Sequence, residues 1–373
     1  HGYIKFSRQG WWGGNAVPHI IASKLGNCSF ELIGYGYSDK MMEVAQETVY
    51  MPDDSKFLFT VKNSKIEFTV QQARLQVPCD YEIQFSTFIC PNLSTLVFPP
   101  RGLTTFGQNN KPINHCIFTD FFYDGLNAEL FYGGNKLYLN NCSFHNASVL
   151  VHGRGADITQ CNFVKAYIPL EFLASTANSN IKSCTFSTVE SNLKGGLLKI
   201  PFTTQRYYEY LPNNGQSSHS NSRIGIFSTS SGPVLLNVEN CSVKGFEVGV
   251  WMEGQGVVNI KCGEIKNNDF GVFSAIDSKV YMSSTSPLNI GNQSVTGGYV
   301  DAADNGITIF SWYSGGEINL MNGFNNLNPN NSGNPWTFTT VTTCCPHKNV
   351  SYITYTGYPV IYGQLEDVGC TNA

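Results

Sequence analysis

His115-Cys116-Ile117-Phe118 is the first copy of a motif, a polar residue followed by cysteine and strand-forming residues, that recurs as far as Ile265. The cysteines at positions 116, 142, 161, 184, 241 and 262 are 26, 19, 23, 57 and 21 residues apart. The later copies are Asn141-Cys142-Ser143-Phe144, Gln160-Cys161-Asn162-Phe163, Ser183-Cys184-Thr185-Phe186, Asn240-Cys241-Ser242-Val243 and Lys261-Cys262-Gly263-Glu264-Ile265.

Each interval between cysteines divides into the same parts. A polar turn and a second apolar strand follow the cysteine strand (129–131, 149–151, 170–172, 197–200, 248–252 and 270–273), and a third strand precedes the next cysteine. A period near 20 residues is too short for a helical hairpin but suits a coil of short strands, whose apolar faces are buried when coils stack. Alternation of apolar and polar residues indicates strands with one face in the core. The sequence therefore predicts a β-solenoid.

The repeat resembles the right-handed parallel β-helix superfamily, the pectate-lyase-like fold, most strongly over residues 112–282. In that family a short turn between the second and third sheets often carries a stacked Asn. The turns Leu139-Asn140-Asn141-Cys142 and Val238-Glu239-Asn240-Cys241 look like it, whereas Gln160, Ser183 and Lys261 depart from it. The resemblance implies that cysteine strands form the third sheet, the strands before them the second, and the 149–151 type the first.

We expect one all-β domain with terminal caps. Residues 1–50 are predicted to be an N-terminal cap, with 39–46 as a helical segment and Trp11-Trp12 over the first coil, because an open solenoid end exposes core and strand edges. The β-helix covers 51–322. The 57-residue step is explained by an insertion at 201–233, a length typical of functional or disordered loops. Residues 323–373 are predicted to form a C-terminal β cap or a link to a following domain.

Composition points to an extracellular protein. Of 373 residues 13% are charged, roughly half the usual share, and the net charge is −4 without a basic run. These features give no support for nucleic-acid or anionic-membrane partners. No apolar stretch approaches the ~20 residues of a membrane span. The chain starts at His1 without Met, so we expect a processed or truncated product that belongs to a larger precursor.

The twelve cysteines suggest thiols more than bridges or metal sites. Those of the repeat are expected to be buried as small apolar side chains. A disulfide from Cys370 to Cys344 or Cys345 is expected if the protein is secreted. The spacing predicts no structural zinc site and no cofactor. Asp53-Asp54 and Asp301 with Asp304 are candidate calcium ligands, although solvated turn residues are the simpler interpretation.

Strand alternation places a row of polar and aromatic side chains on the outer face of the first sheet. It predicts that Trp251 and Glu253 point to solvent while Val248, Val250 and Met252 fill the core. A groove with an aromatic wall and mixed charges suits an extended glycan. Polar residues must also fill any water-facing sheet, and an exposed charge pair contributes under ~1 kcal/mol. The expected ligand-binding residues are Trp251, Glu253, Arg154, Arg206, Tyr207 and Tyr208, and the catalytic candidates are Glu171, Lys199 and His152.

Two hypotheses follow. The first is a non-catalytic module of a secreted or cell-surface protein, an adhesin or spacer that binds polysaccharide or cell-surface glycan along the first sheet. The second is a polysaccharide lyase or glycoside hydrolase, with His152, Lys199 or Arg206 as base and Glu171 as acid. The enzymes of the resembling superfamily use calcium-binding Asp clusters or Asn-Thr-Asp and Gly-His-Gly motifs. Here Val151-His152-Gly153 and Arg223-Ile224-Gly225 match such motifs only in part. Glu171 and Glu253 are expected to lie several coils apart, too far for a pair of catalytic carboxylates.

Overall fold

A computed structural model describes most of the first two thirds of the chain and isolated strands beyond it. The described residues are 4–7, 28–34, 36, 40–53, 57–96, 100–106, 111–121, 126–129, 136–166, 168–187, 224–230, 232–246, 248–261, 263–266, 268, 270–275, 279–282, 288–290, 293–295, 300–301, 307–312, 317–319, 324–325, 337–342, 349–354 and 360–362. They form two compact units, unit 1 (residues 1–169 with 205–219) and unit 2 (170–204 with 220–373).

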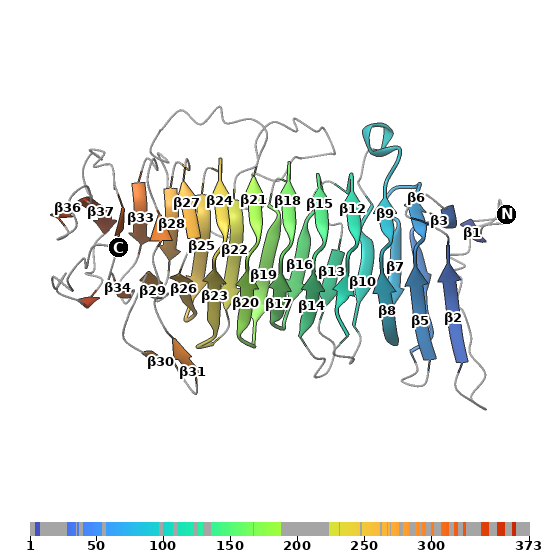
Figure 1. The fold of residues 1–373 in the computed structure, drawn as a ribbon, viewed down its shortest axis with the longest axis horizontal. Helices are drawn as coiled ribbons and strands as arrows, with labels where there is room; N and C mark the ends of the chain where they lie inside the picture. The colour runs from blue at the N-terminus through green and yellow to red at the C-terminus, as the bar shows by residue number, and fades with distance from the viewer. Residues whose placement is uncertain are drawn as a thin grey trace. The chain divides into compact units, whose positions relative to one another are not determined.

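Unit 1 is a stack of three-stranded coils. Along the chain each coil adds one strand to a first, then a second, then a third parallel sheet (Figure 1). The first sheet holds β4 (Thr48–Tyr50), β7 (Arg74–Val77), β10 (Gly102–Thr105), β13 (Leu126–Glu129) and β16 (Val149–His152). The second holds β2 (Cys28–Ile33), β5 (Phe57–Lys62), β8 (Asp80–Gln84), β11 (Ile113–Asn114), β14 (Leu137–Asn140) and β17 (Ala156–Thr159). The third holds β1 (Ile4–Ser7), β3 (Lys40–Ala45), β6 (Lys65–Phe68), β9 (Thr87–Ile89), β12 (Ile117–Thr119), β15 (Ser143–His145) and β18 (Asn162–Val164).

Unit 2 repeats this arrangement. Its first sheet holds β19 (Leu170–Ser175), β22 (Ile224–Ser230), β25 (Val248–Gly254), β28 (Phe270–Ala275), β33 (Ile307–Trp312), β37 (Asn349–Thr354) and the antiparallel β36 (Thr337–Thr342). Its second holds β20 (Ser179–Lys182), β23 (Leu235–Glu239), β26 (Val257–Lys261), β29 (Lys279–Met282), β34 (Glu317–Asn319) and β38 (Val360–Tyr362). Its third holds β21 (Thr185–Ser187), β24 (Ser242–Lys244), β27 (Gly263–Lys266), β32 (Val300–Asp301) and β35 (Phe324–Asn325). A separate hairpin joins β30 (Leu288–Ile290) to β31 (Gln293–Val295).

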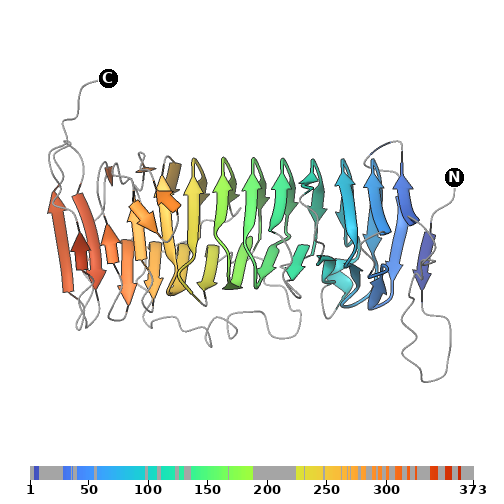
Figure 2. The ribbon, with the colours of Figure 1, turned by 90° about the horizontal axis from the view of Figure 1, so that it is seen from below.

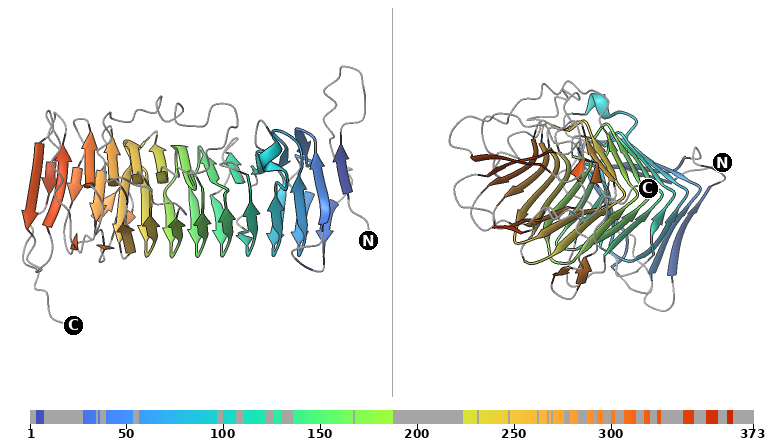
Figure 3. Two further views of the ribbon diagram at one scale, coloured as in Figure 1. Left: turned by 90° about the horizontal axis from the view of Figure 1, so that it is seen from above. Right: turned by 60° about the vertical axis from the view of Figure 1, so that its left-hand side comes forward.

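The predicted fold class is confirmed: the chain forms a parallel β-helix, and successive strands of each sheet lie side by side within each unit (Figure 2). The motif cysteines directly precede strands of one and the same sheet within each unit, numbered here as the third. Figure 3 shows the strands of each sheet stacked behind one another. The described part of the chain holds one short 3-10 helix, Leu93–Thr95, and no α-helix.

A column of rings fills the core of unit 1 behind the third sheet. Phe88, Phe118, Phe144 and Phe163 occupy the same register position, with ring centroids 4.8, 4.8 and 4.6 Å apart and planes within 7° of parallel. All four side chains have no exposed surface. Each ring completes its burial only against the coils on either side, so the stack links neighbouring coils energetically.

The turn between the second and third sheets has the same structure in every described coil of the motif. The residue before each motif cysteine from Cys116 to Cys241 has a positive φ, between 51° and 55°. The buried cysteine after it points its thiol at the carbonyl oxygen two residues earlier, at 3.3 to 3.4 Å. In two earlier coils Ser64 and Ser86 make the same bond at 2.7 Å. The turn therefore selects a small buried donor, either thiol or hydroxyl.

We call the left-handed residues of this turn in unit 1 the corner row. It consists of Asn63, Phe85, His115, Asn141 and Gln160, one residue from each successive coil. Side-chain amides also pair between coils beside the row, as when the Asn140 Nδ2 donates to the Asn114 Oδ1 at 2.9 Å. The stacked asparagines that the resemblance implied are thus present here.

Three expectations about boundaries and elements were wrong. Residues 39–46 do not form a helix, because strand β3 pairs in register with β6 and buries Met42 and Val44. Residues 28–50, placed in the cap, contribute strands β2, β3 and β4 to the coils. The insertion placed at 201–233 includes strand β22, which pairs directly with β19, so it ends before Ile224. Trp11 and Trp12 lie outside the described residues.

Candidate functional site

His152 and Arg154 come from the end of first-sheet strand β16 in unit 1. His152 is exposed at the last position of the strand, as alternation predicts. Arg154 was expected to face outward as well, and this expectation is wrong, since only 2% of it is exposed. Gly153 directly follows the strand, and its φ of 67° breaks the alternation.

The buried Arg154 guanidinium reaches another coil. Its Nη2 donates to the Thr105 carbonyl oxygen and lies 3.2 Å from the Thr105 hydroxyl, and Tyr81 interacts with it electrostatically. Burial lowers the pKa of Arg154 and Tyr81 partly offsets this. The arrangement ties the first-to-second-sheet turn to strands β8 and β10, so Arg154 acts inside the fold and not as a surface ligand.

Glu171 and Trp251 lie on the first sheet of unit 2. Glu171, half-buried in β19, is in register with Phe227 of β22, and Phe227 is in register with Trp251 of β25. Trp251 was expected to point to solvent, and this is wrong because none of its surface is exposed. Its ring meets Phe227 edge to face, with centroids 5.4 Å apart and planes at 88°.

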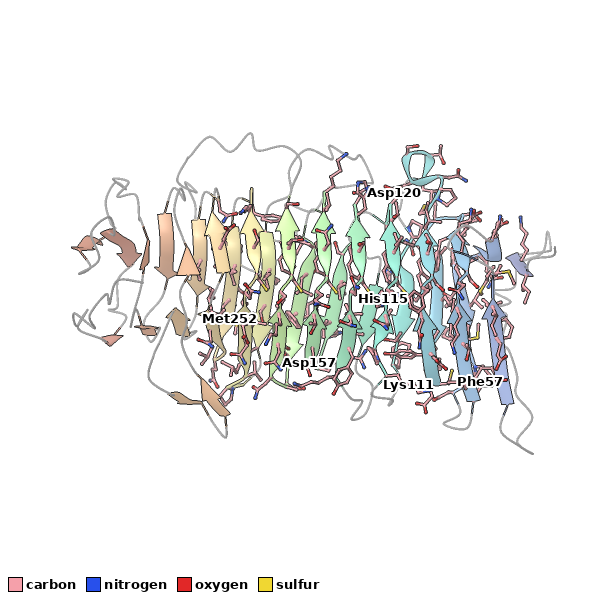
Figure 4. The ribbon with its side chains drawn as sticks, viewed as in Figure 1. Phe57, Lys111, His115, Asp120, Asp157 and Met252 are labelled. Carbon is pink, nitrogen blue, oxygen red and sulfur yellow. The ribbon has the colours of Figure 1, made fainter. Side chains whose placement is uncertain are left out.

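Strand β25 is buried on both faces, which explains the error. Alternation along a strand assigns a side chain to one side of the sheet, but it does not say whether other segments cover that side. The core residues Val248, Val250 and Met252 are buried as expected, and Trp251 is buried as deeply as they are. Figure 4 labels Met252 on this strand. A fully buried indole cannot stack on a sugar ring, so Trp251 is not a glycan platform in this structure.

Glu253 was also expected to be exposed, and this expectation is wrong because only 4% of its surface is accessible. Burial raises the pKa of its carboxyl to about 7, and the neighbouring Trp251 indole opposes this shift. The register partner of Glu253 on the preceding coil is Thr229, whose hydroxyl binds the Ala174 amide at 2.9 Å. A carboxyl that titrates near neutral pH is the kind of group that acid-base chemistry uses.

Glu171 and Glu253 do not come together as a catalytic pair, in line with the expectation that they lie on different coils. Glu171 and Trp251 lie two strands apart in the first sheet, which corresponds to about 10 Å at the usual spacing between neighbouring strands. Glu253 lies a further two residues along β25. Lys199, Arg206, Tyr207 and Tyr208 lie outside the described residues, as do Asp54 and Asp304 of the candidate calcium sites. First-sheet residues 197–200 also lie there, and β22 occupies the position predicted for them.

Sequence reasoning missed Phe227 and Thr229 because it placed them in the insertion. The alternation Ile224, Ile226 and Ser228 was the available signal, since it repeats the pattern of Val248, Val250 and Met252 at a spacing of one coil.

The predictions about cysteines, metal ions and membrane spans can be compared with the structure only where it describes the chain. The motif cysteines from Cys116 to Cys241, together with Cys79 and Cys90, are buried free thiols, as predicted for the motif. The proposed bridge to Cys370 lies outside this part of the chain. Within the described ranges no three His, Cys, Asp or Glu side chains gather closely enough to hold a metal ion. No helix in the same ranges has the length and apolar character needed to cross a membrane.

Comparison with known proteins adds no relative: no family model, no curated protein and no solved structure matches this chain.

Proposed function

We propose that the chain is a β-helix module of a secreted or cell-surface protein, where it serves as a stiff spacer within an adhesin. Other domains of the larger precursor would supply the principal binding activity. The corner geometry supports this proposal best, because the polar groups of each described turn are used to join one coil to the next. The Cys142 thiol, for example, approaches both the Asn140 carbonyl of its own coil and the Ile113 carbonyl of the preceding one, each at 3.4 Å.

Paired charges on the outer faces of the sheets fit the same role. Lys40 contacts Glu43 at 2.7 Å and Glu67 at 2.8 Å, and Lys5 contacts Glu43 at 2.9 Å. Lys62 pairs with Glu82 at 2.7 Å in the second sheet. Such ladders run across coils, so they resist shear between coils while keeping the surface polar.

A spacer tolerates the loss of one coil, whereas a substrate cleft does not. Deletion of residues 143–161 joins Cys142 to Asn162 and removes one complete repeat. The shortened chain should fold and unfold cooperatively, and the adhesion of its parent surface protein should persist. Deletion of residues 143–152 is the matched control, because half a coil puts every later strand into the wrong sheet. Loss of adhesion in a folded 143–161 deletion would contradict the spacer role.

A carbohydrate-active enzyme is the second candidate, favoured by the Glu253 carboxyl beside Trp251. In this alternative Glu253 is the acid that protonates a leaving glycosidic oxygen. The test incubates the chain with neutral and uronate polysaccharides and follows reducing ends and the absorbance of unsaturated uronides. Turnover that disappears in Glu253→Gln would establish this function and exclude a purely structural role.

A further inference from the structure

Phe85 is the anomalous member of the corner row. Its φ is 48°, in the left-handed region where asparagine and glycine are tolerated and a large side chain is strained. Asn63 and Asn141 show what this position normally accepts. An aromatic residue that persists in a strained conformation suggests a role other than closing the turn.

The Phe85 ring is also exposed. Among the residues whose side chains the structure describes, the exposed large hydrophobic side chains are Ile4, Ile33, Phe85 and Ile117. Phe85 and Ile117 come from adjacent coils at the same corner, with exposed fractions of 38% and 37%. Ile117 is in register with Thr87, two residues after Phe85. The corner therefore carries an apolar surface that the fold itself does not bury.

His115 extends this surface by one coil. Its ring lies on the Phe85 ring with centroids 4.8 Å apart and planes tilted by 30°. The Nδ1 is 2.9 Å from the Asn114 Oδ1, and the Nε2 is 2.9 Å from the Asn141 Nδ2. These two side-chain contacts hold the ring in place against Phe85. Figure 4 labels His115 where the second-sheet strand of its coil passes into the third-sheet strand.

Neutral hydrogen-bonding groups border the two rings. On the second-sheet side Gln84, Asn114 and Asn140 are in register on three successive coils. On the third-sheet side the register row is Thr87, Ile117 and Ser143. Lys62 and Lys65 continue these two rows one coil earlier, and each is paired with a glutamate, Lys62 with Glu82 at 2.7 Å and Lys65 with Glu67 at 3.0 Å. The surroundings of the ring pair therefore present amides and hydroxyls.

We propose that Phe85 and His115, with Ile117 and the bordering amides, form a binding ledge for a neutral pyranose ring of an oligosaccharide. The apolar C–H face of a sugar packs on exposed aromatic rings, and amide and hydroxyl groups at the border bind its hydroxyls. The lysines next to the ledge, Lys62 and Lys65, are already paired with glutamates, which disfavours a charged sugar there. The two hydrogen bonds that hold His115 orient the rings before binding, which lowers the entropic cost of association.

Calorimetric titration with cellotetraose and mannotetraose tests the ledge, with polygalacturonate as the charged comparison. A shallow surface of this size should give a dissociation constant on the order of 1 mM for the neutral probe that fits. Phe85→Asn removes the ring and places a favoured residue in the left-handed turn. It should raise the thermal midpoint and abolish binding, whereas Phe85→Tyr should bind within about threefold of the parent chain.

Ile33→Ser is the matched control, because Ile33 is exposed at 55% and lies in β2, two coils before the coil of Gln84 and Phe85. It should leave binding unchanged. The proposed ledge is overturned if neither neutral probe binds. It is also overturned if Phe85→Asn binds a neutral probe as tightly as the parent chain does. Self-association that Phe85→Asn abolishes without any sugar binding would also overturn it, since the surface would then be a contact between copies. These outcomes are independent of the coil deletion that tests the spacer role.

Discussion

Cys142 and Cys161 occupy the same position in adjacent coils, and the Cys142 backbone amide donates to the Cys161 Sγ at 3.4 Å. Each sulfur also faces the carbonyl oxygen two residues before it. The motif cysteine is therefore a small buried group that joins its own turn to the neighbouring coil.

Substitution of Cys142 should follow size and hydrogen bonding. Cys142→Ser should change the unfolding free energy by less than about 1 kcal/mol, because Ser64 and Ser86 make the same turn bond. Cys142→Leu should destabilise the fold by about 1 to 3 kcal/mol through overpacking of a site that is 1% exposed. Urea denaturation measures both. Equal stability of the serine and leucine variants would contradict the steric account.

Gly249 in β25 has no room for a side chain. An added Cβ would lie 2.6 Å from the Gly271 carbonyl oxygen of the next strand. Gly249→Ala should therefore cost about 2 to 3 kcal/mol, as overpacking against rigid backbone does. Gly232→Ala is the matched control because nothing lies within 4 Å of its added Cβ, so its thermal midpoint should stay near that of the parent chain. Thermal denaturation of the two variants in parallel decides the point.

Glu253 should make the protein less stable as pH rises. The folded state raises the carboxyl pKa from its ordinary value near 4.5 to about 7, so the folded state binds the proton more tightly than the unfolded chain. Stability is then greatest below about pH 4.5 and falls until about pH 7, by roughly 3 kcal/mol in total. Glu253→Gln should remove this dependence and stabilise the protein at pH 8. Urea titrations of both proteins at pH 5 and 8 check the sign.

Glu43 should have the opposite effect on stability. The Lys40 hydrogen bond, opposed by burial and helped by Lys5, lowers its carboxyl pKa to about 2. The stability from this pairing is present above the ordinary carboxyl pKa near 4.5 and is lost as pH falls toward 2. Lys40→Met should therefore raise the pH of acid unfolding, measured by circular dichroism. Lys111→Met is the control, because Lys111 lies 3.9 Å from Glu82 and is largely exposed.

The strand alternation and the position of the motif cysteine were sufficient to predict the coil, its three sheets and the buried thiols. Phe118, Phe144 and Phe163 follow the cysteine by two residues each, so their stacking in one core column was implicit in the repeat. The helical prediction for residues 39–46 was wrong because local propensity is weak, and Met42 and Val44 gain more from pairing with β6.

What only the tertiary structure decided is which outward positions remain in water. The sequence determines by period which side of a strand each side chain occupies, since that depends on backbone geometry alone. His152 and Trp251 both occupy outward positions by this criterion, yet one is exposed and the other fully buried. Burial depends on which distant segments cover a face, a property of long-range packing that no local pattern encodes. The same reason moved Glu253 from the surface into the interior and left Phe85 and His115 exposed at the corner, whereas Arg154 turns inward because Gly153 breaks the alternation.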